Sequence, residues 1–189
     1  MSTTVMDRDR SSGMWEVTSR TIVYAAIGAA LYAVLAQIQF PLPGTANVSL
    51  RPGFAIVTFF GFAFGPIVGL FVGLVGNAIA DQLSGWGLLT SWNWSVANGL
   101  VGLLAGVLGV SLAGSIKNRL VLAAVASVIA VAIGFLFVFT DMIIGSADTF
   151  GTALTANYLP VVIGNAIVAA ILTPILVAAW DPIKESIGR

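Results

Sequence analysis

Six apolar stretches, separated by short segments rich in glycine, proline or polar residues, take up most of this 189-residue chain. Hydrophobic residues make up 58% of the sequence and charged residues 8%, whereas about a quarter of a soluble domain is charged. Such stretches are typical of helices that cross a bilayer, where the backbone must satisfy its own hydrogen bonds. We therefore expect an all-α membrane protein with a compact six-transmembrane-helix bundle. The expected helices lie near residues 21–36, 51–64, 66–83, 93–112, 120–144 and 157–180.

The positions of the basic residues predict the orientation of this bundle. With six crossings, seven of the eight Lys and Arg residues fall on one side of the membrane, and Arg51 begins the second helix at the other side. Basic residues are retained on the cytoplasmic side during insertion. We therefore expect a plasma-membrane protein with a cytoplasmic N-terminal tail (1–19), a transmembrane domain (20–182) and a cytoplasmic C-terminal tail (183–189). The polar segment 1–17 does not have the pattern of a signal peptide.

Small residues recur at helical spacing and predict how the helices pack. Helix association in lipid depends on close backbone approach, which glycine and alanine permit. We expect the glycine rows to pack inside the bundle, whereas an alanine row of the first helix could serve either internal packing or an external partner. The glycine rows are Gly61, Gly65, Gly69 and Gly73, and Gly99, Gly102, Gly106 and Gly109; the alanine rows are Ala25, Ala29 and Ala33, and Ala26 with Ala30.

Polar side chains within the apolar stretches gather toward the outer half of the expected bundle. Asn77 and Asp81 continue the glycine row of the third helix at four-residue spacing, so they should face the interior. Ionisable groups at membrane depth usually mark a binding site or an ion pair, and Arg51 could pair with Asp81 or Asp141. Hydrogen bonding between helices would not favour one half, so we expect a pocket open to the outside. Its candidate substrate-binding residues are Arg51, Asn77, Asp81, Trp86, Trp92, Trp94, Asn98, Asp141, Asn157, Tyr158 and Asn165.

Three of the five tryptophans lie in or beside one outer loop, at Trp86, Trp92 and Trp94. Tryptophan forms belts at both surfaces of a membrane, which is one interpretation of this cluster. The rings could also stack on a flat heteroaromatic ligand. The sequence leaves both interpretations open.

The chain lacks residues and motifs on which many reactions depend. It has no cysteine and no histidine, which excludes disulfides, thiol nucleophiles, imidazole bases and the usual zinc or haem ligands. It has no phosphate-binding loop of the Walker type, so the chain by itself does not use ATP. A formal net charge of zero gives no reason to expect a nucleic-acid partner. We expect no enzymatic activity, no cofactor and no metal, and a partner that supplies energy for moving a ligand.

Four features follow one another within residues 49–109: Arg51-Pro52, the turn Gly65-Pro66, the segment 73–81, and a tryptophan-rich loop before Asn98-Gly99. In order and spacing they resemble the substrate-binding S components of energy-coupling factor (ECF) transporters, nearest to the riboflavin-type subfamily. The resemblance covers about residues 20–180. It implies a six-helix subunit that captures a vitamin or related micronutrient from outside, at a site under the outer loops.

The resemblance also implies partners. S components work with a transmembrane coupling subunit and two cytoplasmic ATPases, and a row of small residues on the first helix docks against the coupling subunit. Here that row is either Ala25, Ala29 and Ala33, or Ala26 and Ala30. Relatives often carry a histidine and a lysine in the segment that reads GNAIAD at residues 76–81 here, so the resemblance does not transfer a substrate.

Three hypotheses follow from the sequence. The leading one is high-affinity capture of a vitamin or related micronutrient by an S component, with Arg51 and Asp81 fixing polar groups of the ligand. The second is a stand-alone carrier coupled to protons through Asp81 and Asp141, which would need no partner. The third is a structural subunit of a membrane complex, whose polar residues satisfy one another and bind no ligand.

Overall fold

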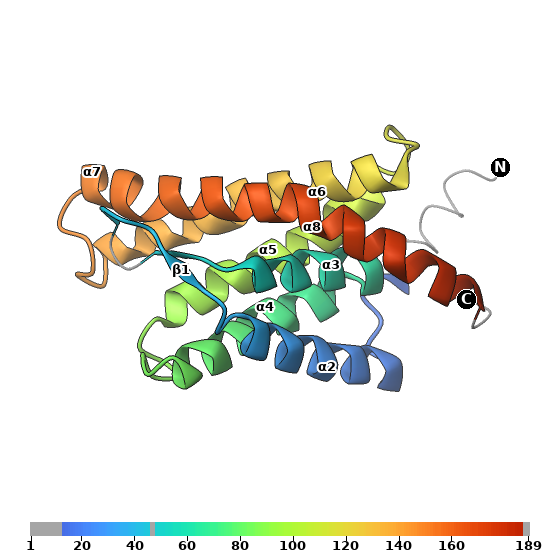
Figure 1. The fold of residues 1–189 in the computed structure, drawn as a ribbon, viewed down its shortest axis with the longest axis horizontal. Coiled ribbons are helices and arrows are strands. Elements are labelled where there is room, and N and C mark those ends of the chain that lie inside the picture. Colours follow the sequence, from blue (N-terminus) through green and yellow to red (C-terminus); the bar gives the residue numbers. More distant parts are fainter. Residues whose placement is uncertain (1–12, 46–47, 187–189) are drawn as a thin grey trace.

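The computed structural model describes residues 13–45 and 48–186. In this part of the chain, six main helices run along the length of one bundle, and the chain reverses direction at the two ends (Figure 1). The main helices are α2 (Ser19–Leu35), α3 (Ala55–Phe64), α4 (Pro66–Leu83), α5 (Trp92–Ser111), α6 (Arg119–Gly134) and α8 (Leu159–Ser186).

Short elements gather at the end of the bundle that carries α7, on the left of Figure 1. β1 (Phe40–Pro41) pairs antiparallel with β2 (Ser49–Leu50), and the 3₁₀ turn η1 (Pro52–Phe54) leads from there into α3. The remaining short elements are the 3₁₀ helix η2 (Phe135–Met142), which continues α6, and α7 (Phe150–Thr152) and the π-helical segment η3 (Ala153–Tyr158), which precede α8.

The helices fit the expected all-α membrane protein. Four helical segments of the described chain are long and apolar enough to cross a bilayer, and two apolar segments, Ser19–Leu35 and Pro52–Phe64, are shorter. Each expected stretch therefore forms a helix, while six crossings remain a prediction. The last helical segment runs over Phe150–Ser186, so the limits 157–180 are too narrow, and helix occupies part of the expected C-terminal tail. The four long segments are Pro66–Leu83, Trp92–Ser111, Arg119–Met142 and Phe150–Ser186.

Helix α3 is short and lies in the middle of the bundle. All of its residues from Ala55 to Gly61 are buried, and it packs against α2, α4, α5 and α8. The hydroxyl oxygens of Thr58 and Thr173 lie 2.6 Å apart and join α3 to α8 in the core. Neighbouring helices thus enclose a helix that is too short to cross a hydrocarbon layer of about 30 Å by itself.

Glycine allows α4 and α5 to approach closely. A Cβ atom added to Gly69 would collide with the backbone of Gly102, and one added to Gly102 would collide with that of Gly69. Gly61 and Gly73 meet the backbone of α5 in the same way. The internal packing predicted for the glycine rows is confirmed at these positions, and it accounts for the close contact of α4 with α5.

The two alanine rows of α2 lie in different environments. Ala25, Ala29 and Ala33 are at most 6% exposed, because this face of α2 packs against α4. Ala26 and Ala30 are exposed. The first row is therefore covered in this structure, whereas the second row is accessible. Docking of a partner on either row stays a prediction.

Candidate substrate-binding site

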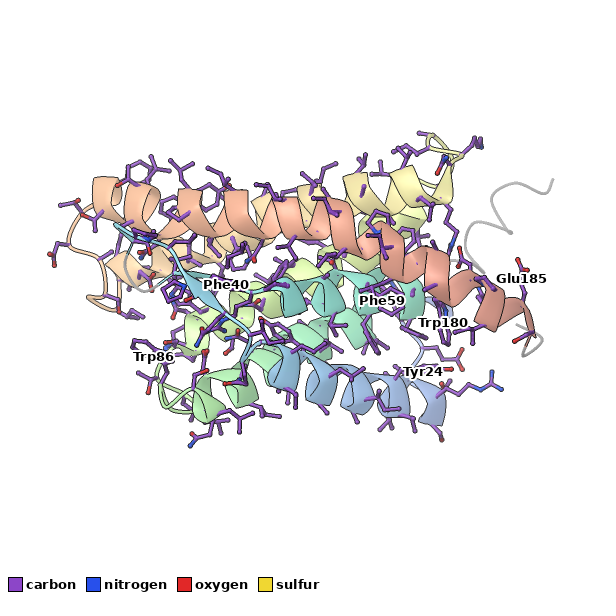
Figure 2. All side chains as sticks on the ribbon, viewed as in Figure 1. Tyr24, Phe40, Phe59, Trp86, Trp180 and Glu185 are labelled. Atoms are coloured by element: carbon purple, nitrogen blue, oxygen red, sulfur yellow. The ribbon has the colours of Figure 1, made fainter. Side chains whose placement is uncertain are left out.

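A cavity of about 260 Å³ lies at the end of the bundle that carries β2 and the loop after α4, which we call the cavity end. Its lining comes from α2, α4, α5, η2, η3, α8 and the segments beside β2. Figure 2 places Trp86 at this end, and Trp180 and Glu185 at the opposite end. Because α4 ends and α5 begins beside the cavity, the polar residues near those two helix ends meet there.

Nine of the eleven candidate substrate-binding residues line this cavity. Five of them come from α4 and α5 and from the loop between these helices, and the others come from four separate segments of the chain. The spacing argument for α4 is confirmed, since Asn77 and Asp81 are 3% and 7% exposed and lie inside the bundle. The nine residues are Arg51, Asn77, Asp81, Trp86, Trp94, Asn98, Asp141, Asn157 and Asn165.

Two candidate residues lie elsewhere. The Tyr158 hydroxyl donates to the carbonyl oxygen of Ala132 at 2.9 Å, and its ring packs on Phe139 with centroids 5.3 Å apart. Trp92 is 44% exposed and lies on an apolar outer surface formed by α4, α5 and their connecting loop. These two side chains therefore do not line this cavity, and their part in substrate binding stays a prediction.

The sequence interpretation missed several lining residues. Tyr32 could have been predicted from the sequence. It lies one helical turn after Ala29, and this spacing places its ring on the buried face of α2. Asn93 directly precedes Trp94 but was not identified. The other missed lining residues are Val48, Ser49, Phe54, Thr90, Ser91, Phe135, Ile144, Ser146 and Val161.

Arg51 and Asp81 form an ion pair on one side of the cavity. Nη1 of Arg51 lies 3.5 Å from Oδ1 of Asp81, and Nε donates to Oε1 of Gln39 at 3.3 Å. The other carboxylate oxygen, Oδ2, accepts a hydrogen bond from Nδ2 of Asn77 at 3.0 Å. Of the two pairings open from the sequence, the structure contains the one with Asp81.

Asp141 is held by neutral donors on another side of the cavity. Its Oδ1 accepts a hydrogen bond from Nδ2 of Asn93 at 2.7 Å, and its Oδ2 accepts one from Nδ2 of Asn157 at 2.7 Å. Nε1 of Trp94 lies 3.1 and 3.2 Å from the two oxygens. These contacts bring η2, the start of α5 and η3 together, although the residues are far apart in the sequence.

Tyr32 connects α2 to this site. Its hydroxyl lies 3.2 Å from Oδ1 of Asn77 and 3.3 Å from Oδ1 of Asn98, and it can donate its single proton to either. Nδ2 of Asn77 also donates to Ser95 at 3.1 Å. One hydroxyl thus links α2, α4 and α5 where all three meet the cavity.

The lining of the cavity combines aromatic rings with polar and charged side chains. Aromatic side chains of Tyr32, Phe54, Trp94 and Phe135 line the cavity together with the amides and charged groups. No group of three or more Asp, Glu, His or Cys residues that could hold a metal occurs among the described residues. Ligand pockets usually place a few polar groups in apolar walls, and this lining is more polar than that.

The chain is similar to one protein family and to individual curated proteins. Residues 16–181 match the model of the family described as "ECF-type riboflavin transporter, S component". Proteins named "UPF0397 protein", from three strains of Streptococcus pneumoniae, are 43% identical to the chain over 90 residues. This alignment covers 48% of the chain and 48% of each relative, so the chain spans about half the length of the curated relatives it matches. No solved structure matches the chain.

Proposed function

The chain belongs to the family of ECF-type riboflavin transporter S components, and from this premise we propose that it captures a vitamin or related micronutrient outside the cell for an ATP-driven importer. This family consists of substrate-binding transport subunits in the cell membrane, not of enzymes. The proposed partners are a transmembrane coupling subunit and two cytoplasmic ATPases. The coupling subunit and the ATPases would supply the energy that this chain has no motif to provide.

One observation carries the proposal: most of the buried polar side chains in the described part of the bundle lie around one cavity. Asn77, Asp81, Asn98, Asp141 and Asn157 line it, and each is at most 7% exposed. Burying polar groups costs free energy unless they are paired, and ionisable groups at membrane depth usually mark a site. A cavity that keeps so many of them beside open space is suited to a polar ligand.

We place the cavity end outside the cell, with six crossings and both termini in the cytoplasm. At the opposite end, Nε of Arg119 lies 2.9 Å from Oδ2 of Asp181, and Lys117 and Lys184 are close to this pair in the sequence. Basic residues favour the cytoplasmic side. Among the described residues, Arg51 is the basic residue of the cavity end, and it is engaged by Asp81.

We further propose that the coupling subunit docks on the exposed face of α2. This face carries Ala26 and Ala30, and the neighbouring Val23, Ile27 and Val34 are 53%, 49% and 64% exposed. Small residues at four-residue spacing permit another helix to approach closely. The adjacent buried row of Ala25, Ala29 and Ala33 is already used for packing on α4.

Ligand binding tests the proposal most directly. Trp86 and Trp94 line the cavity, so their fluorescence should change when the purified chain is titrated with vitamins and their precursors. Failure of every vitamin and precursor to bind more tightly than about 1 mM, or about −4 kcal/mol, would contradict it. Co-purifying molecules identified by mass spectrometry would provide a second, unbiased readout.

The stand-alone proton-coupled carrier is not favoured, because the family match is to a subunit that binds substrate for a larger transporter. That alternative requires uptake into vesicles containing this chain alone, and the uptake should collapse with an uncoupler. The same vesicles supplemented with coupling subunit, ATPases and ATP distinguish the two functions.

A further inference from the structure

This inference rests on the proposed function. We propose that the cavity binds a cationic ligand, namely a small heteroaromatic nutrient that carries a fixed positive charge or a protonated amino group. The charge of the ligand is a property that the family match does not specify. The charged groups, unused acceptors and aromatic rings around the cavity all favour a positive ligand over an anionic one.

Among the described residues, two carboxylates and one guanidinium line the cavity, those of Asp81, Asp141 and Arg51. Residues Ala46 and Asn47, which lie outside the described residues, carry no charge. With all three groups ionised, the lining has one negative charge in excess. In a site that is partly removed from water, this excess acts on a ligand more strongly than it would in bulk solvent.

Arg51 does not offer a free anion site. Its Nε donates to Gln39 at 3.3 Å and its Nη1 approaches Asp81 at 3.5 Å. An anion placed against this guanidinium would also lie near the Asp81 carboxylate. With Asp141 in the same cavity, three negative groups would then share one positive charge, which Coulomb repulsion disfavours.

Asp141 lacks a counter-charge. It is 2% exposed, and the side chains that donate to its carboxylate, Asn93, Trp94 and Asn157, are all neutral. It has no ion-pair partner in the described part of the chain. Buried charges in proteins are normally paired, and a cationic ligand would supply the pairing that the protein lacks.

Two side chains of the cavity have hydrogen-bond acceptors that are not fully used, and a ligand with a donor group could bind to them. Oδ1 of Asn157 is buried and has no hydrogen-bond partner among the described residues, while the other end of the same amide donates to Asp141. The Asp81 carboxylate accepts from Arg51 and Asn77, which leaves lone pairs available, since a carboxylate offers about four acceptor positions. An amino group of a ligand could donate to either acceptor.

Aromatic rings beside the cavity would also attract a positively charged ligand. The rings of Phe54 and Phe135 lie with centroids 5.8 Å apart, and those of Trp94 and Phe135 lie 6.4 Å apart. All three line the cavity. A cation within about 6 Å of such a ring face is attracted to it, and a flat heteroaromatic cation can also stack there.

A series of probes that differ in charge tests this inference on the unmodified protein. Thiamine and pyridoxamine represent cations, pyridoxine and riboflavin neutral molecules, and nicotinate and pantothenate anions. Isothermal titration of the purified chain at pH 7 should show a cationic probe binding at least about tenfold more tightly than any neutral or anionic one. Pyridoxamine and pyridoxine share a ring, so that pair compares charge at nearly constant shape.

Two substitutions test whether the preference for cationic probes arises from the carboxylates of the cavity. Asp141→Asn should weaken binding of the cationic probe by about tenfold or more, while Asp81→Asn should also improve binding of anions, because it releases Arg51. Asp181→Asn is the matched control at the opposite end, where the side chain is 30% exposed, and it should leave the affinity unchanged. Circular dichroism establishes that each variant is folded.

The possible outcomes distinguish failure of the cationic assignment from failure of the proposed transport function. Tightest binding by an anion or by a neutral probe would overturn the cationic assignment and leave the transport function intact. A cation whose affinity is unchanged in folded Asp141→Asn and Asp81→Asn variants would also overturn it. Absence of binding by every probe would count against the cationic assignment and the proposed function together.

Discussion

Nη1 of Arg51 lies 3.5 Å from Oδ1 of Asp81, and the pair joins the segment before η1 to α4 beside the cavity. The two side chains are 18% and 9% exposed, so neither is well hydrated. Because Arg51 immediately precedes Pro52, this contact also fixes the point at which the chain enters the short helix α3. It thus contributes both to the site and to the position of a central helix.

Arg51→Gln should destabilise the protein. Asp81 would keep its hydrogen bond from Asn77 but lose its charged partner, and an incompletely satisfied buried carboxylate costs about 1–3 kcal/mol. Thermal unfolding in detergent should therefore shift to lower temperature. The double variant with Asp81→Asn should recover part of the loss, because it removes the unpaired charge. Equal stability of the single variant and the parent would show that the pair is not structurally important.

Tyr32→Phe should weaken ligand binding without unfolding the bundle. The variant removes one hydroxyl that serves Asn77 and Asn98, and a net loss of about 1 kcal/mol, or about fivefold in affinity, is expected. Fluorescence titration measures the affinity. Tyr158→Phe is the matched control, because it also removes a hydrogen-bonding hydroxyl but outside the cavity. A larger effect at Tyr158 than at Tyr32 would contradict the site described here.

Ala30→Trp should abolish ATP-driven uptake in vesicles that also contain the coupling subunit and ATPases, while ligand binding by the purified chain persists. Ala30 is exposed on α2, so a bulky ring there blocks docking without entering the bundle. Ile171→Trp is the control, since Ile171 is exposed on α8, and uptake should continue. Normal uptake by Ala30→Trp would exclude this face as the docking surface.

Ala29→Trp should behave differently. Ala29 is 3% exposed and faces α4, so the added ring overpacks the interface, at a cost of about 1–3 kcal/mol or more. Ligand binding and thermal stability should both fall. Retention of both in Ala29→Trp would indicate that this row is more accessible than its burial suggests.

Single cysteines test the orientation cleanly, because the natural chain contains no cysteine. Leu89→Cys places a thiol in the loop at the cavity end, where the side chain is 73% exposed, and Ser115→Cys places one in the exposed loop between α5 and α6. A membrane-impermeant maleimide should label the first variant in intact cells and the second only after permeabilisation. The reverse pattern would place the cavity inside the cell and refute capture from outside.

The helical spacing of residues was sufficient to predict which side chains are buried where burial depends only on the face of their own helix. The glycine row leading to Asn77 and Asp81 identified the buried face of α4, because residues four apart lie on the same side of a helix. Composition likewise predicted apolar helices, since a chain in lipid must satisfy its backbone hydrogen bonds locally. The polar clustering at one end could also be read from the order of helices and loops.

The same spacing argument was insufficient where α8 begins. Tyr158 and Asn165 are seven residues apart and would share a face of a regular α-helix, yet only Asn165 lines the cavity. The hydroxyl of Tyr158 instead donates to the carbonyl oxygen of Ala132, and its ring packs on Phe139. These contacts depend on how neighbouring helices pack, which spacing along one helix does not specify.

The sequence by itself determined the class of fold, the positions of its helices and the end of the bundle that concentrates polar groups. Only the tertiary structure decided that Arg51 pairs with Asp81, that Asp141 is held by Asn93, Trp94 and Asn157, and that Ala26 and Ala30 stay exposed. The reason is that spacing fixes where a side chain lies around its own helix axis. The rotation of each helix against its neighbours, which sets every contact between helices, depends on how all of them pack together.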